Sequence, residues 1–359
     1  MEVNMDKKIV YAEPADYIPE DLRKKYKLGE YAESELLKKL KSLMIGHAVG
    51  DALGVPVEFC SREELEELPV IDMMGWGSYP VPEGCWSDDT SMSLATLDSL
   101  KKGKIDYDDI MENFVAWVSR DEYTPTGEVF DMGRTCLTAI RNYLKTDRKP
   151  ALECGLDEDF SNGNGSLMRI HPVAFYLYHK GYEMSEALEI IHKVSSITHA
   201  HERSKVACGI YTLVLWELLK NPNKLSVYEG LKKASDFYAS SSEFEVYKNR
   251  LIDRIGNLET MSSNKAVERN EIRSTGYVVD TLEAAIWCVL TTKDYKECVL
   301  RAVNLGEDTD TVAAVAGGLA GVLYGYDAIP QEWLVQIKKL DYIESMCEEA
   351  EKKWKIPDE

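Results

Sequence analysis

The sequence predicts an all-α protein, and two observations carry that prediction. Apolar side chains recur near the 3.6-residue period of a helix from about Ser34 onward, first at Leu36, Leu37, Leu40, Leu43 and Met44. Alternating patterns bounded by hairpin turns, which would indicate strands, are scarce along the chain. Helices that pack on helices are therefore the expected architecture.

Eight further segments repeat the helical spacing. They are 90–100, which Gly103 closes, 107–118, 133–144, 185–195, 203–219, 278–290, 295–305 and 311–323. The last of them contains the apolar, glycine-rich stretch that begins at Val312. That stretch is too short to cross a bilayer and follows a dense acidic run, so it is expected to be a tightly packed helix.

The chain has 359 residues, of which 45% are hydrophobic, and this is enough for a large core. Residues 1–32 are polar and contain Pro14 and Pro19, so they are predicted to be an N-terminal extension. Residues 33–359 are expected to form a single domain. Within it, 222–274 is polar and rich in lysine, serine and asparagine, and is predicted to be a variable insertion with helical portions.

The formal net charge of −20 argues against a surface that tracks nucleic acid phosphates. An anionic substrate would need local help from metal ions, helix N-termini or glycine-rich backbone. The eight cysteines are scattered without metal-binding or redox spacing, which indicates a reducing, cytoplasmic compartment. No signal peptide or membrane span is expected, and the protein is expected to be a monomer.

Two acidic junctions precede apolar helices, GCWSDDTSM from Gly84 and NLGEDTDTV from Asn304. Helix capping would need one such residue at each junction. The junctions instead crowd carboxylates and hydroxyls together, at Ser87, Asp88, Asp89 and Thr90 and at Glu307, Asp308, Thr309, Asp310 and Thr311. Repelling carboxylates beside apolar helices favour a site for hard cations, although capping and solvated loops stay open.

Residues 308–310 also resemble the acidic motif of haloacid dehalogenase-like phosphatases. That motif follows a strand, whereas a helical segment precedes it here.

Three other patterns suggest chemistry. GDALGVPVEF from Gly50 supplies Asp51 and Glu58, and Glu58 is the stronger candidate because it lies beyond Pro56, off the regular helix. SNGNGSLMRI from Ser161 is either a simple turn or a loop whose backbone N–H groups converge on an anion. His199, just before a predicted helix, is either a ligand-binding residue or a cap or core histidine.

Five segments, in this order, resemble the ADP-ribosylglycohydrolase family: GDALGVPVEF, WSDDTSM, GEVFDMG, GNGSLMRIHPVA and GEDTDTVAAVAGGLAGVLYG, with SITHAHERS as a weaker sixth. Together they extend over about 43–326, most of the chain. The resemblance implies a compact, orthogonal bundle of helices. It also implies two adjacent divalent cations, Mg²⁺ or Mn²⁺, at the bottom of a cleft that receives ADP-ribose.

The resemblance also implies roles for individual residues. One cation would take Ser87, Asp88, Asp89 and Asp310, and the other would share Asp310 and add Asp308 and Thr311. Water activation would fall to Glu58 or Asp89, with the choice left open. Substrate would contact Asp131, Asn162, Gly163, Asn164, Gly165, Ser166 and His199.

Two positions depart from the family pattern. Ser87 stands where threonine is usual, and Asp280 stands where relatives often have histidine.

The function predicted from the sequence is a metal-dependent glycosidase that releases ADP-ribose from a modified protein or a small conjugate. The alternatives are a non-catalytic ADP-ribose-binding relative and a two-metal phosphoesterase. The sequence does not identify the acceptor, because arginine, serine and other adducts present the same ADP-ribose.

Overall fold

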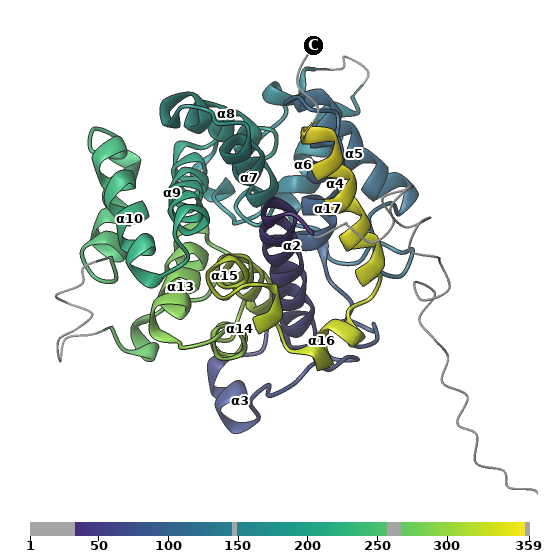
Figure 1. Ribbon diagram of the computed structural model, residues 1–359, viewed down its shortest axis with the longest axis vertical. Helices are drawn as coiled ribbons and strands as arrows, with labels where there is room; N and C mark the ends of the chain where they lie inside the picture. The colour runs from purple at the N-terminus through teal and green to yellow at the C-terminus, as the bar shows by residue number, and fades with distance from the viewer. Residues whose placement is uncertain (1–32, 146–148, 257–266, 356–359) are drawn as a thin grey trace, which may run out of the picture. The chain divides into compact units, whose positions relative to one another are not determined.

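The computed structural model describes residues 33–145, 149–256 and 267–355, and in these ranges the regular structure is entirely helical (Figure 1). The only β pairing among them is two isolated bridges, Leu156 with His199 and Gly163 with Tyr277. The all-α prediction is therefore confirmed. The chain divides into residues 1–36 and 37–359, and the predicted extension over 1–32 lies outside the described residues.

The helices follow one another along the chain as α2 Glu35–Gly54, α3 Arg62–Glu67, α4 Asp88–Leu100, α5 Tyr107–Arg120, α6 Arg134–Tyr143, α7 His171–His179, α8 Met184–Ser196, α9 Glu202–Lys220, α10 Lys224–Tyr238, α11 Glu245–Tyr247, α13 Val278–Thr291, α14 Tyr295–Val303, α15 Thr309–Tyr324, α16 Gln331–Gln336 and α17 Leu340–Trp354. All nine segments predicted to be helical contain a helix, and for the eight segments with two predicted ends, both ends lie within two residues of those observed. Helices α3, α7, α10, α11, α16 and α17 were not individually predicted.

Helices α2 and α15 cross near the middle of Figure 1. The GDALG motif ends α2, and the second acidic junction begins α15. Every residue of α15 from Thr309 to Leu323 is buried, as expected for the glycine-rich stretch. The backbones touch: a Cβ on Gly46 would lie 2.6 Å from the Gly317 carbonyl oxygen, and one on Gly50 would lie 2.1 Å from that of Ala313. Only glycine permits this approach, which brings the ends of both helices together at the site.

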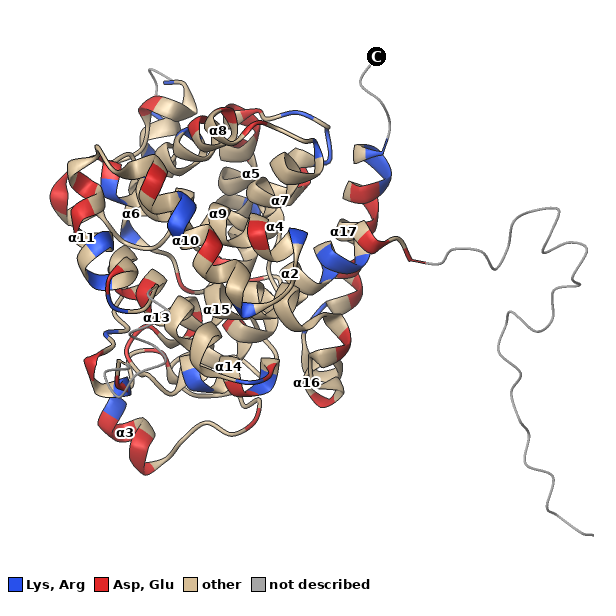
Figure 2. Cartoon of the chain, turned by 60° about the vertical axis from the view of Figure 1, so that its left-hand side comes forward, with Lys and Arg blue, Asp and Glu red and all other residues tan. Residues whose placement is uncertain are grey.

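Helix α10 packs along α9, and its Val227, Leu231 and Ala234 are fully buried. The described part of 222–274 thus contributes to the core, while its status as a variable insertion stays a prediction. None of the described helices is long and apolar enough to span a membrane. In Figure 2, Lys and Arg are interspersed with Asp and Glu rather than gathered on one basic face in this view.

Candidate active site

Asp51, near the end of α2, holds the first acidic junction in place. Its carboxylate accepts hydrogen bonds from the Ser87 N–H (2.8 Å), the Thr90 N–H (3.0 Å) and the Thr90 hydroxyl (2.6 Å). Complete burial raises the pKa of Asp51 to about 6, although these hydrogen bonds oppose the shift. Its role is therefore to fix the start of α4 against α2, which the sequence pattern did not reveal.

In the first turn of α4, the residue that caps the helix is Ser87, and the neighbouring carboxylates of Asp88 and Asp89 do not cap it. The Ser87 hydroxyl caps the helix by accepting the Asp89 N–H, so the capping interpretation is correct for this residue. Asp88 accepts the Gly133 N–H at 3.3 Å, and Asp88 and Asp89 are both buried. The carboxylates themselves do not cap α4, which leaves them available for a ligand.

The second acidic junction, at the start of α15, meets the first. The Thr311 hydroxyl donates to Asp89 Oδ2 at 3.1 Å across 222 positions of sequence. Asp310 Oδ1 accepts the Thr311 N–H at 2.9 Å, and Asp308 accepts from the Asn164 amide at 2.8 Å. The structure thus brings together the two junctions that the sequence singled out.

A backbone clamp joins the Glu58 loop to the second junction. Phe59 donates its N–H to the Glu307 carbonyl, and Glu307 donates its own to the Cys60 carbonyl, both at 2.7 Å. Phe59 and Glu307 have φ values of 69° and 64°, a left-handed conformation that costs a non-glycine residue about 1–2 kcal/mol. The clamp holds Glu58 and Asp308 at a fixed separation despite this strain.

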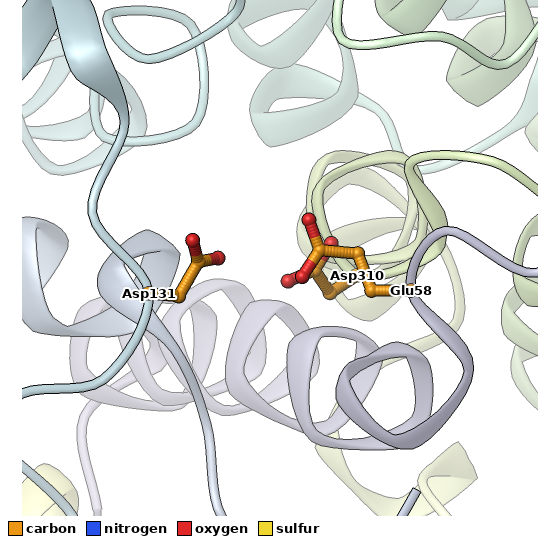
Figure 3. Close-up of side chains that lie close together, drawn as sticks. All are labelled: Glu58, Asp131 and Asp310. Carbon is orange, nitrogen blue, oxygen red and sulfur yellow. The ribbon is translucent and has the colours of Figure 1, made fainter. Parts of the chain in front are cut away.

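Three carboxylates from separate segments form a cluster that could hold a metal ion. One oxygen from each of Glu58, Asp131 and Asp310 lies within 4.8 Å of the others. Figure 3 shows Glu58 beside Asp310, with Asp131 facing them from a different segment. Asp131 itself has a left-handed φ of 54°.

Three buried carboxylate oxygens near this cluster have no hydrogen-bond partner among the described residues. They are Glu58 Oε2, Asp89 Oδ1 and Asp310 Oδ2. A buried acceptor without a donor is costly, and hard divalent cations take oxygen ligands of this kind. The residues present therefore fit a divalent cation.

Burial and mutual repulsion together oppose ionisation of the cluster. Burial raises the pKa of Asp88, Asp89 and Asp310 well above the usual range of a carboxyl, and raises that of Asp308. The pKa of Glu58 rises to about 8, first through burial and then through the charge of Asp131. A cation would relieve the repulsion and favour the ionised forms of the carboxylates that bind it.

Tyr79 is a site residue that no sequence pattern indicated. Burial raises the pKa of Glu58 and that of Asp131, the latter to about 6, and a hydrogen bond from the Tyr79 hydroxyl opposes both shifts. The Tyr79 ring packs at 5.3 Å from that of Phe130, next to Asp131 in the chain. Tyr79 lies in a loop and belongs to no motif or periodic pattern, so the sequence did not predict this role.

The carboxylates open onto a cavity of about 210 Å³. The predicted residues that line it are Glu58, Asp88, Asp131, Gly163, Asn164, Gly165, His199, Asp308 and Thr311. The first turn of α6 also lines it, through Arg134, Thr135 and Cys136, and so does Gly276; none of these was predicted. The N-terminus of α6 and Arg134 contribute positive potential to the lining beside Asp88, which accepts the Gly133 N–H.

Five predicted residues do not line the cavity and lie behind its wall. Asp89 and Asp310 are buried among the junction residues, as described above. The Asn162 side chain accepts the Ser204 hydroxyl, and the Ser166 hydroxyl accepts that of Ser195 at 2.9 Å. These two side chains therefore hold the loop against the interior through hydrogen bonds. Ser87 caps the N-terminus of α4.

Asp280, the departure from the family pattern, does not line the cavity. Its carboxylate pairs with Arg250 and accepts the Thr275 hydroxyl at 2.6 Å. Thr275 precedes Gly276, which does line the cavity. Any effect of Asp280 on substrate would thus act through this loop.

Comparisons with known proteins agree with this geometry. The family model described as ADP-ribosylglycohydrolase matches residues 32–358. The ADP-ribosylarginine hydrolase Tri1 of Serratia proteamaculans (strain 568) is 33% identical over 318 residues, covering 88% of this chain and 80% of that protein. The ADP-ribosyl-[dinitrogen reductase] glycohydrolase of Rhodospirillum rubrum is 31% identical, covering 82% and 88%. A solved structure titled ADP-ribosylglycohydrolase-related protein complex superposes with a TM-score of 0.70 at 26% identity, covering 89% and 99%.

Proposed function

The chain belongs to the ADP-ribosylglycohydrolase family and is a hydrolase of ADP-ribose conjugates, and we propose that its substrate is ADP-ribosylarginine on a modified protein. Two relatives named as ADP-ribosylarginine hydrolases, at 33% and 31% identity, support arginine as the acceptor. The relative from Rhodospirillum rubrum, whose name specifies a protein substrate, supports a macromolecular acceptor.

The observation that carries the proposal is the set of buried carboxylate oxygens without a hydrogen-bond partner among the described residues, on Glu58, which lines the cavity, and on Asp89 and Asp310 behind its wall. Two divalent cations, Mg²⁺ or Mn²⁺, would be held by Ser87, Asp88, Asp89, Asp308, Asp310 and Thr311, with Asp310 shared. When bound, such cations orient ribose hydroxyls and lower the pKa of water. Asp131 and Glu58 are close enough to Asp310 to complete the oxygen environment.

Another part of the cavity lining suits the anionic part of ADP-ribose. The first turn of α6, with Arg134, lines the cavity together with Gly163 and Gly165, and Gly165 packs so closely on Cys136 and His199 that a Cβ would lie 2.8 Å from each. A helix N-terminus and a guanidinium both favour phosphate. The Asn164 amide is already used, because it donates to Asp308 and to the Thr281 hydroxyl, so this side chain orients a carboxylate.

Glu58 is the residue best placed to move a proton. Hydrolysis of a ribosyl bond passes through an oxocarbenium-like state and needs proton transfer to the leaving group and from water. Glu58 lines the cavity, and burial raises its pKa to about 8, near the pH at which a proton donor works best. Asp89 lies deeper, and its Oδ2 already accepts the Thr311 hydroxyl, which suits a ligand role.

The test is an Asp310→Asn variant assayed for release of ADP-ribose from a protein modified on arginine, with a serine-modified protein in parallel. Turnover with Mg²⁺ or Mn²⁺ should be lost while the helical circular dichroism is retained, because the amide removes a ligand but preserves shape. Asp341→Asn, at an exposed position on α17, is the matched control and should behave as wild type.

Undiminished turnover in metal-stripped Asp310→Asn would refute the metal assignment. Preference for the serine adduct would refute the acceptor. Two further results would support the alternative functions, namely release of phosphate in place of intact ADP-ribose, and binding of ADP-ribose without turnover.

A further inference from the structure

A completely buried arginine lies behind the wall of the cavity. Arg169 is 0% exposed and forms no ion pair in the part of the chain that the structure describes. Its Nη2 donates to the Val194 carbonyl at 3.2 Å and to the Thr198 hydroxyl at 2.8 Å, and its guanidinium lies 4.7 Å from the Phe114 ring centre. An interior guanidinium without a carboxylate is costly, so its retention calls for a role.

The hydroxyl that Arg169 contacts also contacts His199. Thr198 Oγ1 lies 2.9 Å from His199 Nδ1. A guanidinium can only donate, so Thr198 Oγ1 accepts from Arg169 and keeps one proton to give away. The imidazole nitrogen is a stronger acceptor than the Cys136 sulfur, the other group with which the Thr198 hydroxyl interacts.

The ring of His199 reaches the cavity on its other side. A Cβ on Gly165 would lie 2.8 Å from His199 Cε1, and one on Gly163 would lie 3.7 Å from Nε2. Burial, with the Arg169 charge in addition, lowers the pKa of His199 to about 3, so the ring is neutral at physiological pH. A neutral imidazole carries one proton, and the bond at Nδ1 determines which nitrogen holds it.

We propose that Arg169 and Thr198 are positioning residues that hold His199 as the Nε2–H tautomer, which donates a hydrogen bond to an oxygen of ADP-ribose. The order of donation is Arg169 to Thr198, Thr198 to His199 Nδ1, and His199 Nε2–H to the ligand. The identity of the ligand rests on the proposed function, whereas the tautomer follows from the contacts alone.

The experiment compares Thr198→Val, which removes the hydroxyl at nearly constant shape, with Thr198→Ser, which keeps it. Nitrogen-15 NMR of histidine-labelled protein reports the tautomer of His199, and calorimetry reports affinity for ADP-ribose. Wild type and Thr198→Ser should show Nε2–H. Thr198→Val should gain the Nδ1–H form, bind ADP-ribose roughly fivefold to tenfold more weakly, and raise KM more than it lowers kcat. Thr198→Ala provides the same comparison if the valine variant does not fold.

An unchanged His199 tautomer in Thr198→Val would overturn the proposal that Thr198 determines which ring nitrogen carries the proton. A changed tautomer with unchanged affinity would overturn the donation to ADP-ribose. If wild-type protein did not bind ADP-ribose, the proposed function would fail, and the NMR comparison would still decide the role of Thr198 on its own.

Discussion

Gly54, the last residue of α2, lies directly against the metal-ligand candidate Asp310. A Cβ at this position would lie 2.3 Å from the Asp310 Cα and 2.4 Å from its nitrogen. The backbone of Gly54, with φ −83° and ψ −35°, is ordinary right-handed helix that alanine adopts freely. Gly54→Ala therefore tests the space between α2 and α15 and nothing about backbone conformation.

The expected effect follows from that overlap. An ordinary contact begins at 3.4 Å, so the start of α15 must move by about 1 Å from its 2.3 Å position. Overpacking of this kind costs about 1–3 kcal/mol, and alanine recovers at most about 1 kcal/mol of helix propensity. The free energy of unfolding should fall by up to about 3 kcal/mol. Turnover should fall about 100-fold, because a 1 Å displacement of a catalytic group has that effect.

Gly318→Ala, on α15, the helix that Gly54 faces, is the matched control. The added Cβ would lie 3.1 Å from the Tyr211 hydroxyl and 3.5 Å from Leu43 Cδ1, both ends of side chains that can adjust. Its unfolding free energy should stay within about 1 kcal/mol of wild type, with turnover preserved. Urea denaturation and release of ADP-ribose measure both quantities. Wild-type turnover and stability in Gly54→Ala would refute the claim that this contact sets the position of Asp310.

Three more perturbations test the electrostatics of the site. Tyr79→Phe should raise the pKa of Glu58 further, because the lost hydrogen bond lowers it, and should move the basic limb of the kcat/KM profile to higher pH, since a proton donor is active only while it is protonated; an unmoved limb would contradict this role. Burial raises the pKa of Glu58 to about 8 and of Asp131 to about 6 in the folded state. The folded, metal-free protein thus retains protons that the unfolded chain releases, so its Tm should fall as pH rises from about 5 to 8. Added Mn²⁺ should reverse that fall, and a flat metal-free profile would argue against the clustered charges. Asp51→Asn should cost about 1–3 kcal/mol in urea denaturation, because an amide oxygen and NH₂ replace a carboxylate that accepts from Ser87 and Thr90. A wild-type midpoint would show that these bonds do not hold the junction.

Periodicity found the helices that bury one face and missed others for identifiable reasons. Helix α7 is buried from His171 to Leu177, so it has no polar face to give a period. Helix α10 is polar over most of its length, and its buried stripe is interrupted by Gly230, which lets α9 approach. Helix α17 did carry a usable signal, because its buried residues Ile343, Cys347, Ala350 and Trp354 follow helical spacing.

The candidate site was predictable where chemistry is concentrated in adjacent residues. Carboxylates packed beside apolar helices indicated both junctions, and the structure joins them through Thr311 and Asp89. Side-chain direction within the 162–166 loop was not predictable, because backbone turns decide which of Asn162 and Asn164 faces the cavity. The role of Tyr79 depends on its hydrogen bonds to Glu58 and Asp131, which lie in other segments of the chain. The sequence around Tyr79 therefore does not predict this role.

The burial and mutual repulsion of the clustered carboxylates oppose folding. Other residues make the contacts that hold the segments of the cluster together. The close approach of α2 and α15 at their glycines brings Gly54 against Asp310. The backbone clamp between Phe59 and Glu307 fixes Glu58, and Asp51 holds the start of α4 by accepting the Ser87 N–H. Each of these contacts is complete without a cation, whereas the buried oxygens of the cluster are not. A bound cation should therefore stabilise the fold, because it would accept the lone pairs of these oxygens and offset the repulsion among the buried carboxylates.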